Sequence, residues 1–391
     1  MKVYCPDCGT QAELTPERWR CGCGGAWEPT HLPPFEPALI DENDCSIWRY
    51  RRLYGLRPSE PAFRMGAGWT PLLPLNVAGR RVWVKLEYLA PTGSFKDRGT
   101  ELMMNVLAAQ GVSRVAEDSS GNAGASVAAY AARGGMEAEI YVPAHASPAK
   151  LAQIRVYGAH VTPVPGPRAN AKQAAIASVA RGAVYASHAY HPAFLLGQMS
   201  VAYEVWEQLG RRAPDWYLAP VGQGVHLLGA WLGFRHLWQA GLIERVPRMV
   251  GVQAALLAPV SAALEAGLDH VPAVEPRGTS LAEGLAINPP VRGRRLLQAI
   301  RDSGGTCLTV TEEEIVEACA QMAGLGFYIE PSSAVVVAAL KQLDALAGVD
   351  EDVVAPLTGS GLKGRPELHS ARPAADPTGL RSAACPATPT I

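Results

Sequence analysis

The chain has 391 residues, enough for a large buried core and for two or three domains. Its 35 basic and 36 acidic side chains give a formal net charge of −1, so it lacks the basic excess that is typical of proteins binding nucleic acid or anionic membranes. The start, "MKVYCPDCGT", has no apolar signal region, and no apolar run approaches the roughly 20 residues that span a bilayer. We therefore expect a cytoplasmic protein that binds neither nucleic acid nor membrane.

Four of the eight cysteines crowd the beginning of the chain. They form C-x2-C in "CPDCG" and then C-x-C in "CGCGG", which is close to the spacing of a zinc ribbon. The glycine after each pair would let backbone amides face the thiolate sulfurs. Two disulfides, or free thiols in a flexible arm, are the alternative. We expect a structural zinc ion with no open coordination position, held by Cys5, Cys8, Cys21 and Cys23.

The rest of the chain has the pattern of an α/β protein. Residues 31–65 are rich in proline and aromatic residues and look like an extended lead-in, and residues 365–391 have the composition of a flexible tail. Between them, short β-rich runs alternate with alanine- and leucine-rich stretches, which indicates βαβ units and largely parallel sheets. The predicted strands are 81–87, 137–143, 159–164, 215–221, 248–254 and 352–358, and the predicted helices are 122–134, 169–181, 194–209, 225–240, 312–323 and 332–347.

Three turns rich in glycine, serine and threonine follow predicted strands, at 117–126, 220–229 and 356–364. Ligands of open α/β sheets bind at such positions, beyond the carboxyl ends of strands. In the second turn, "PVGQGVHLLG", Gly222 and Gly224 could let backbone amides hold an anion. A tight strand-to-helix turn is the alternative, and a dinucleotide site would need a glycine where Leu227 stands.

The first turn, "EDSSGNAGAS", opens a helix, and its serines and Asn122 could either cap that helix or bind a carboxylate. A further stretch, "PTGSFKDRGT" at 91–100, puts Lys96 at a helix start, where the helix dipole disfavours a cation. An amine, an anion cradle and a strand end bearing a hydroxyl group together match the needs of pyridoxal 5′-phosphate. That cofactor requires a Schiff-base lysine, a phosphate site and partners for its ring oxygen and ring nitrogen.

In this order and at these distances, "PTGSFKDRG", "SSGNAGAS" and "LTGSGLKG" resemble the fold-type II pyridoxal-phosphate enzymes, and within them the threonine-synthase-like family. The resemblance covers roughly residues 65–364, and the cysteine-rich start is similar to a zinc-ribbon-like segment of some members. It implies a two-domain α/β fold with parallel or mixed sheets covered by helices, and commonly a homodimer. The expected units are a zinc-ribbon-like segment (1–30), a large domain binding the cofactor (31–99 with 206–364), a small α/β domain (100–205) and the tail (365–391).

The resemblance also implies roles for individual residues. Lys96 would hold the cofactor as an internal aldimine and then move the α-proton of the substrate. Thr358 would face the ring nitrogen, and this neutral partner suits elimination or replacement at the β and γ carbons. The remaining cofactor contacts implied are Phe95 beside the ring, Asn122 on the ring hydroxyl, and the phosphate cradle of Gly222, Gln223, Gly224 and Val225. The substrate would meet Ser119, Ser120 and Gly121 through its carboxylate.

The match weakens in "YASHAYHPAFLLGQMSVAYE", residues 185–204. Threonine synthases usually grip the phosphate of O-phosphohomoserine there with asparagine, serine and arginine. Here His188, Ala189, His191 and Phe194 stand in that region, and phenylalanine offers a phosphate neither charge nor hydrogen bond. His188 and His191 are candidate substitutes, although each alone reads equally as a loop histidine.

Three hypotheses follow. The first is a lyase of the threonine-synthase type, which converts O-phosphohomoserine and water into threonine and phosphate. The second is a dehydratase of serine or threonine, or a β-replacement enzyme similar to cysteate synthase. The third is a catalytically silent regulator that binds the cofactor.

Overall fold

The computed structural model describes residues 1–56, 61–146 and 148–363, so the predicted tail lies outside the described residues. The larger sheet has six strands in the order β12-β11-β10-β13-β5-β4. All neighbours in it are parallel except the β4–β5 hairpin. The last strand along the chain, β13, therefore lies in the middle of this sheet, between β10 and β5. The strands are β4 (Leu72–Val77), β5 (Arg80–Lys85), β10 (Trp216–Pro220), β11 (Arg248–Ala254), β12 (Thr306–Val310) and β13 (Val353–Pro356).

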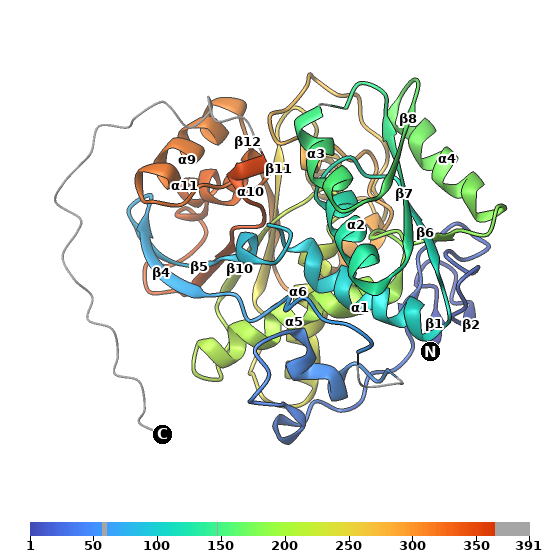
Figure 1. Ribbon diagram of the computed structural model, residues 1–391. Helices are drawn as coiled ribbons and strands as arrows, with labels where there is room; N and C mark the ends of the chain where they lie inside the picture. Colours follow the sequence, from blue (N-terminus) through green and yellow to red (C-terminus); the bar gives the residue numbers. More distant parts are fainter. Residues whose placement is uncertain (57–60, 147, 364–391) are drawn as a thin grey trace.

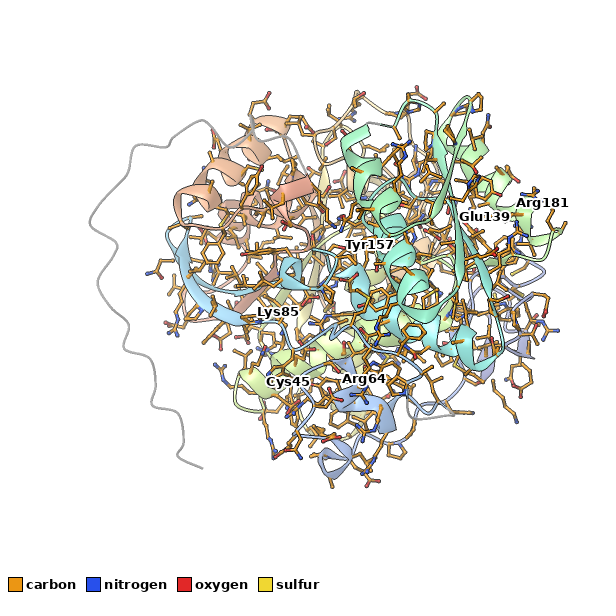
Figure 2. The ribbon with its side chains drawn as sticks, in the orientation of Figure 1. Cys45, Arg64, Lys85, Glu139, Tyr157 and Arg181 are labelled. Atoms are coloured by element: carbon orange, nitrogen blue, oxygen red, sulfur yellow. The ribbon has the colours of Figure 1, made fainter. Side chains whose placement is uncertain are left out.

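The smaller sheet is fully parallel, in the order β8-β7-β6-β9. Figure 1 shows it on the other side of the molecule from β4 and β5, with helices of the intervening chain beside it. At its outer edge, Glu139 and Arg181 lie near each other (Figure 2), and the hydroxyl of Tyr141 bonds to both, at 2.6 and 2.8 Å. Its strands are β6 (Arg114–Glu117), β7 (Glu137–Pro143), β8 (His160–Val164) and β9 (Val184–Tyr185).

Three helices in the middle of the molecule pack tightly on one another: α1 (Lys96–Ala109), α5 (Pro192–Gln208) and α6 (Val225–Gln239) (Figure 1). Glycines allow this approach. A Cβ on Gly197 of α5 would overlap the carbonyl oxygen of Arg98, and a Cβ on Gly229 of α6 would overlap Gln198. Because α1 begins at Lys96, these contacts fix the position of that residue in the interior.

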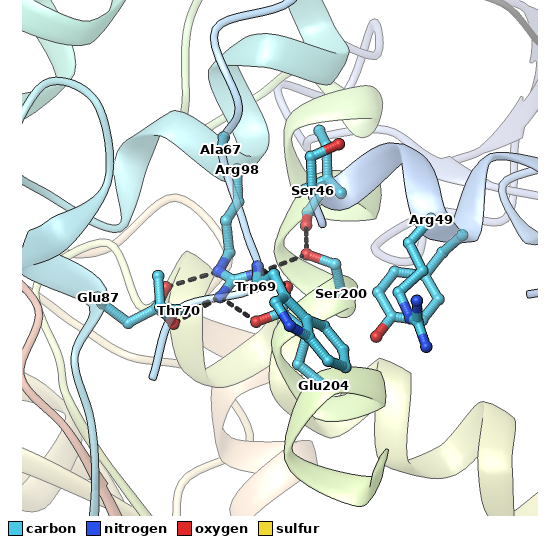
Figure 3. A network of polar contacts seen from close by, with 12 residues as sticks. Ser46, Arg49, Ala67, Trp69, Thr70, Glu87, Arg98, Ser200 and Glu204 are labelled. Atoms are coloured by element: carbon cyan, nitrogen blue, oxygen red, sulfur yellow. Dashed lines mark hydrogen bonds and ion pairs between the residues drawn. The ribbon is translucent and has the colours of Figure 1, made fainter. Parts of the chain in front are cut away.

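A fully buried ionic network ties α1 and α5 to the large sheet (Figure 3). Arg98 donates to both oxygens of Glu87, each at 2.6 Å, and it also pairs with Glu204. Lys85, at the end of β5, donates to the other side of Glu204 at 2.7 Å (Figure 2 marks Lys85). Two cations and two carboxylates therefore balance one another without water, as buried charges require.

The remaining helices cover the sheets. They are α2 (Asn122–Gly134), α3 (Pro148–Val156), α4 (Arg168–Val179), α7 (Pro259–Glu265), α8 (Gly293–Asp302), α9 (Glu312–Gly324), α10 (Pro331–Ala338) and α11 (Leu340–Leu343). No helix among the described residues is both long enough and apolar enough to cross a membrane.

The predicted α/β architecture with parallel and mixed sheets is confirmed. All six predicted strands are present. The predicted helix over 332–347 is divided into α10 and α11, which meet at Ala339. Helix α5 (192–208) crosses the predicted domain boundary at 205/206 and packs against helices on both sides of it. The division into domains stays a prediction.

The expectation of an extended lead-in over 31–65 was wrong in part. A short helical segment, η2 (Ile47–Leu53), forms there after η1 (Pro37–Leu39), and Ile47, Trp48 and Tyr50 join the main hydrophobic core. The aromatic residues that marked this segment bury large apolar areas, which explains why it folds onto α5.

The cysteine-rich start forms a small antiparallel sheet, β2-β1-β3 (Gln11–Glu13, Lys2–Tyr4 and Glu28–Pro29). It is anchored to the body of the protein by Glu28, which accepts two hydrogen bonds from Arg295 at 2.8 and 2.7 Å. Trp19 adds edge-on contacts to Tyr185 and Tyr190.

Candidate functional site

Lys96, the first residue of α1, has a half-buried side chain. Its Nζ lies 4.3 Å from the centre of the Phe95 ring, and no acceptor or acid among the described residues binds it. Burial lowers the pKa of Lys96 to about 8, although the charges of Glu117 and Glu330 act in the opposite direction. A large fraction of this amine is therefore neutral in weakly alkaline solution, the form in which lysine acts as a nucleophile or a base.

The turn that carries Lys96 is held by two of the motifs found in the sequence. The amide of Phe95 donates to the carbonyl of Thr358 at 3.0 Å, so the "LTGSGLKG" turn lies directly beside it. The Phe95 ring meets the ring of His226 edge-on, with 4.8 Å between centres, and His226 is the second residue of α6. Gln198 joins both partners, donating to the carbonyl of Phe95 at 3.0 Å and contacting His226 at 3.2 Å.

The start of α6 offers backbone amides without an acceptor. Gly224 has a left-handed conformation (φ 70°), which turns the chain from β10 into the helix. Within the described chain, no protein group accepts from the amides of Gly222, Gln223 or Gly224, and the first helical amides, such as that of Val225, have none inside the helix. The side chain of Gln223 accepts from Val291 instead, at 3.0 Å. This helix start is suited to an anion, as predicted.

Asn122 opens α2 and has protein partners on both ends of its amide. Its Nδ2 donates to both oxygens of Glu330, at 2.9 and 3.0 Å, and its Oδ1 accepts from Lys363 at 3.1 Å. Glu330 precedes α10, and Lys363 belongs to the "LTGSGLKG" motif. The predicted bond from Asn122 to a cofactor hydroxyl stays a prediction.

The residues before Asn122 form a close turn at the start of α2. The hydroxyl of Ser119 accepts from the amide of Gly121 at 3.3 Å, while Ser120 is half-buried beside it. A Cβ on Gly124 would overlap the carbonyl oxygen of Ser119, so the turn can lie this close only over a glycine. The predicted role of these residues toward a substrate carboxylate is not tested by this geometry.

His188 forms a buried pair with Glu117, which the sequence reasoning had not selected. Its Nδ1 lies 2.7 Å from Oε1 of Glu117. Burial raises the pKa of Glu117 well above its ordinary value, and Asp118 adds to this effect while Lys96 opposes it. Burial, with the charges of Lys96 and Arg168, lowers the pKa of His188 well below its ordinary value. His188 is therefore neutral near pH 7, and it lies in the same electrostatic environment as Lys96.

His191 has the simpler of the two roles considered for it. It is the cap residue of α5, and its Nδ1 accepts from the amide of Ala193 at 3.2 Å. Burial and the charge of Arg292 lower the pKa of His191 to about 3, so this ring is a neutral hydrogen-bond acceptor. No described contact joins it to Lys96, and its predicted contact with substrate stays a prediction.

The four predicted metal ligands converge. The sulfur atoms of Cys5, Cys8, Cys21 and Cys23 all lie within 4.8 Å of one another, as four ligands of one ion would. Two of the residues are buried and two are exposed. The cluster is linked to the segment before α5 through Arg292, which donates to the carbonyls of Trp27, Ala189 and Tyr190 at 2.9, 3.0 and 3.0 Å.

Comparison with known proteins agrees with this arrangement. Residues 63–359 match the family model described as "Pyridoxal-phosphate dependent enzyme". The chain belongs to this family. Threonine synthases of Methanocaldococcus jannaschii and Methanosarcina acetivorans are both 32% identical to it over 378 residues, covering 93% and 92% of either chain.

Solved structures give the same fold. The chain of a structure titled as a threonine deaminase of T.th. is 28% identical, with a TM-score of 0.64 over 74% of the enzyme and 92% of that chain. Maize serine racemase has a TM-score of 0.65 over 75% and 88% of the two chains, but at 22% identity it shows the fold alone.

The residues around Lys96 fit pyridoxal phosphate. The free amine of Lys96 would attach its aldehyde, and the amides before α6 would hold its phosphate, as their missing acceptors suggest. When bound, this group withdraws electrons from the α-carbon of an amino acid. The chain itself supplies the rest: Lys96 is placed to carry a proton, Phe95 and His226 exclude water on one side, and the start of α2 offers amides to a carboxylate.

Proposed function

We propose that the enzyme is an amino-acid lyase that breaks a carbon–oxygen bond at the β or γ carbon of its substrate, with Lys96 as the catalytic residue. The observation that carries this proposal is the Lys96 amine, which has a pKa of about 8 and no protein partner. It stands beside two helix starts, of α2 and α6, that suit a carboxylate and a phosphate group.

The first candidate reaction converts O-phosphohomoserine and water into threonine and phosphate. It is supported by the relatives named threonine synthase, whose similarity extends over nearly the whole chain. The cysteine cluster would then hold a structural zinc ion that stabilises the first 30 residues, and we further propose that the enzyme is a homodimer.

The second candidate is the dehydration of serine or threonine, or replacement at their β carbon. It is supported by the residues at the place where a phosphate grip was expected. There the Phe194 ring meets His188 edge-on at 5.9 Å, and His188 bonds to a carboxyl group. The likeness to the structure titled threonine deaminase agrees with it.

The test is a comparison of the purified enzyme with Lys96→Ala, and with Lys341→Ala as the control because Lys341 is exposed. Each protein is supplied with pyridoxal phosphate and screened for phosphate release, threonine formation and ketoacid formation. We expect Lys96→Ala to lose both the visible absorption band of the attached cofactor and all turnover, while the control keeps both. A Lys96→Ala protein that retains the band and the turnover would refute the proposal.

A further inference from the structure

Glu117 is a buried carboxyl group that uses only half of its hydrogen-bonding capacity. It has no solvent exposure, and its Oε1 is paired with His188 at 2.7 Å. Its Oε2 is buried and has no hydrogen-bond partner among the described residues. An unpaired buried oxygen of this kind is costly, and such a group in a native protein calls for an explanation.

The position of Glu117 suggests one. It is the last residue of β6, and His188 comes shortly after the neighbouring parallel strand β9, so both lie beyond the carboxyl ends of adjacent strands. Glu117 directly precedes the turn that starts α2, and its charge is felt at Lys96. Ligands bind in α/β proteins at this edge of a sheet.

The charged groups around the pair have mixed signs. Lys96 and Arg168 act on it as cations, and Asp118, whose carboxylate accepts from the hydroxyl of Tyr185 at 2.7 Å, acts on Glu117 as an anion. Arg168 is exposed at the start of α4, so water screens it. The groups that are buried with the pair give a phosphate no second cation beyond Lys96.

The neighbouring side chains do not complete a phosphate grip either. The Phe194 ring closes one side of His188, and it leaves so little space that a Cβ on Gly99 would lie 2.6 Å from it. The carbonyl of Ala189 is held by Arg292. A phosphate ester entering here would meet a carboxyl group and an aromatic ring, whereas anion sites are usually built from cations and hydroxyl groups.

We propose that Glu117, held in place by His188, is a specificity-determining residue that accepts a hydrogen bond from a free hydroxyl group on the substrate side chain, and that it thereby selects hydroxy amino acids over their phosphate esters. This inference rests on the proposed lyase function and decides between its two candidate reactions. Oε2 of Glu117 gains the donor that it lacks, and the serine or threonine class of substrate supplies that donor.

The experiment measures binding and turnover of the holoenzyme with L-serine, L-threonine, O-phospho-L-serine and O-phospho-L-homoserine. Binding is read from the change in the visible spectrum of the bound cofactor, and turnover from ketoacid or phosphate. The variants are Glu117→Gln, Arg168→Ala and, as the matched control, Glu137→Gln, an exposed glutamate on the next strand.

We expect the wild-type enzyme to bind and convert the hydroxy amino acids at least about 10-fold better than the esters, because a buried polar group is left unpaired by a substrate that cannot bond to it. Glu117→Gln should lower kcat/KM for serine or threonine by about 10- to 100-fold, mainly through KM, and reduce the preference over the esters. Arg168→Ala and Glu137→Gln should leave the values for serine and threonine nearly unchanged.

Two results would overturn the proposal. One is a wild-type preference for a phosphate ester that Arg168→Ala removes, which would assign the side-chain subsite to the arginine. The other is a Glu117→Gln enzyme that lowers binding of all four compounds equally, as a merely structural residue would. If no compound is turned over, the lyase function fails, but the ratio of dissociation constants still decides the selectivity.

Discussion

The buried network of Arg98, Lys85, Glu87 and Glu204 makes a quantitative prediction for Glu204→Gln. The substitution keeps the shape of the side chain and its acceptor oxygen, but it removes one of two carboxylates that balance two cations. All four side chains are fully buried, so the remaining net positive charge has no access to water. The fold should therefore lose stability although no atom is deleted from the core.

The size of the loss follows from the pKa of Glu204. Burial alone would raise this pKa, but Arg98 and Lys85 together lower it from its ordinary 4.5 to about 2. A pKa that is lower in the folded state stabilises the fold fully above about 4.5, and this contribution is lost as the pH falls toward 2. The difference corresponds to about 3 kcal/mol at pH 7 and to about half of that at pH 3.

Urea unfolding of both proteins, followed by circular dichroism, measures this effect. We expect Glu204→Gln to lower the free energy of unfolding by about 3 kcal/mol at pH 7, and the gap to narrow as the medium is acidified. The control is Glu317→Gln, which removes an exposed pair with Lys341 and should cost less than about 1 kcal/mol. A loss at pH 7 no larger than that of the control, or a gap that does not change with pH, would refute the electrostatic reasoning.

Four further predictions concern the site and the metal cluster. Acetylation of Lys96 in the cofactor-free enzyme, followed by mass spectrometry, should reach half its maximal rate near pH 8, and a midpoint above pH 10 would contradict the effect of burial. Metal analysis should find zinc in the wild-type protein and little in Cys21→Ser; a metal-free wild type would exclude the zinc site. Gly224→Ala strains a turn with φ 70° and overlaps a leucine side chain, so it should weaken cofactor binding by about 1–3 kcal/mol, whereas Gly241→Ala, with the same φ and open space, should not. His191→Ala should cost about 1 kcal/mol of stability through loss of a helix cap and leave turnover unchanged; a fall in turnover alone would restore its predicted role in substrate binding.

The sequence predicted the strands that are long and apolar and missed those that are short or interrupted. β9 has only two residues and β6 has four, too few for a period of two to be recognised. β4, "LLPLNV", contains Pro74, which argued against a strand. The proline is tolerated because β4 is an edge strand, and this position becomes known only once the sheet order is known.

The candidate site was predictable where local motifs carry it and unpredictable where distant side chains meet. Lys96 and the turn before α6 have local signatures, and the structure brings them close through Phe95 and His226. The pair of Glu117 and His188 joins residues 71 positions apart. The two acids directly before "SSGN" were the one local sign that something other than a helix cap is present, because helix starts rarely need a buried carboxyl group.

The central place of β13 in the large sheet has a consequence for biosynthesis. During translation, β5 and β10 are made long before residues 353–356, yet each pairs with β13 and they do not pair with each other. The Lys96 turn likewise receives its bond from Thr358 only at this late stage. A nascent or truncated chain thus exposes two unpaired strand edges and has no finished cofactor site, so aldehyde capture by Lys96 becomes a marker of completed synthesis.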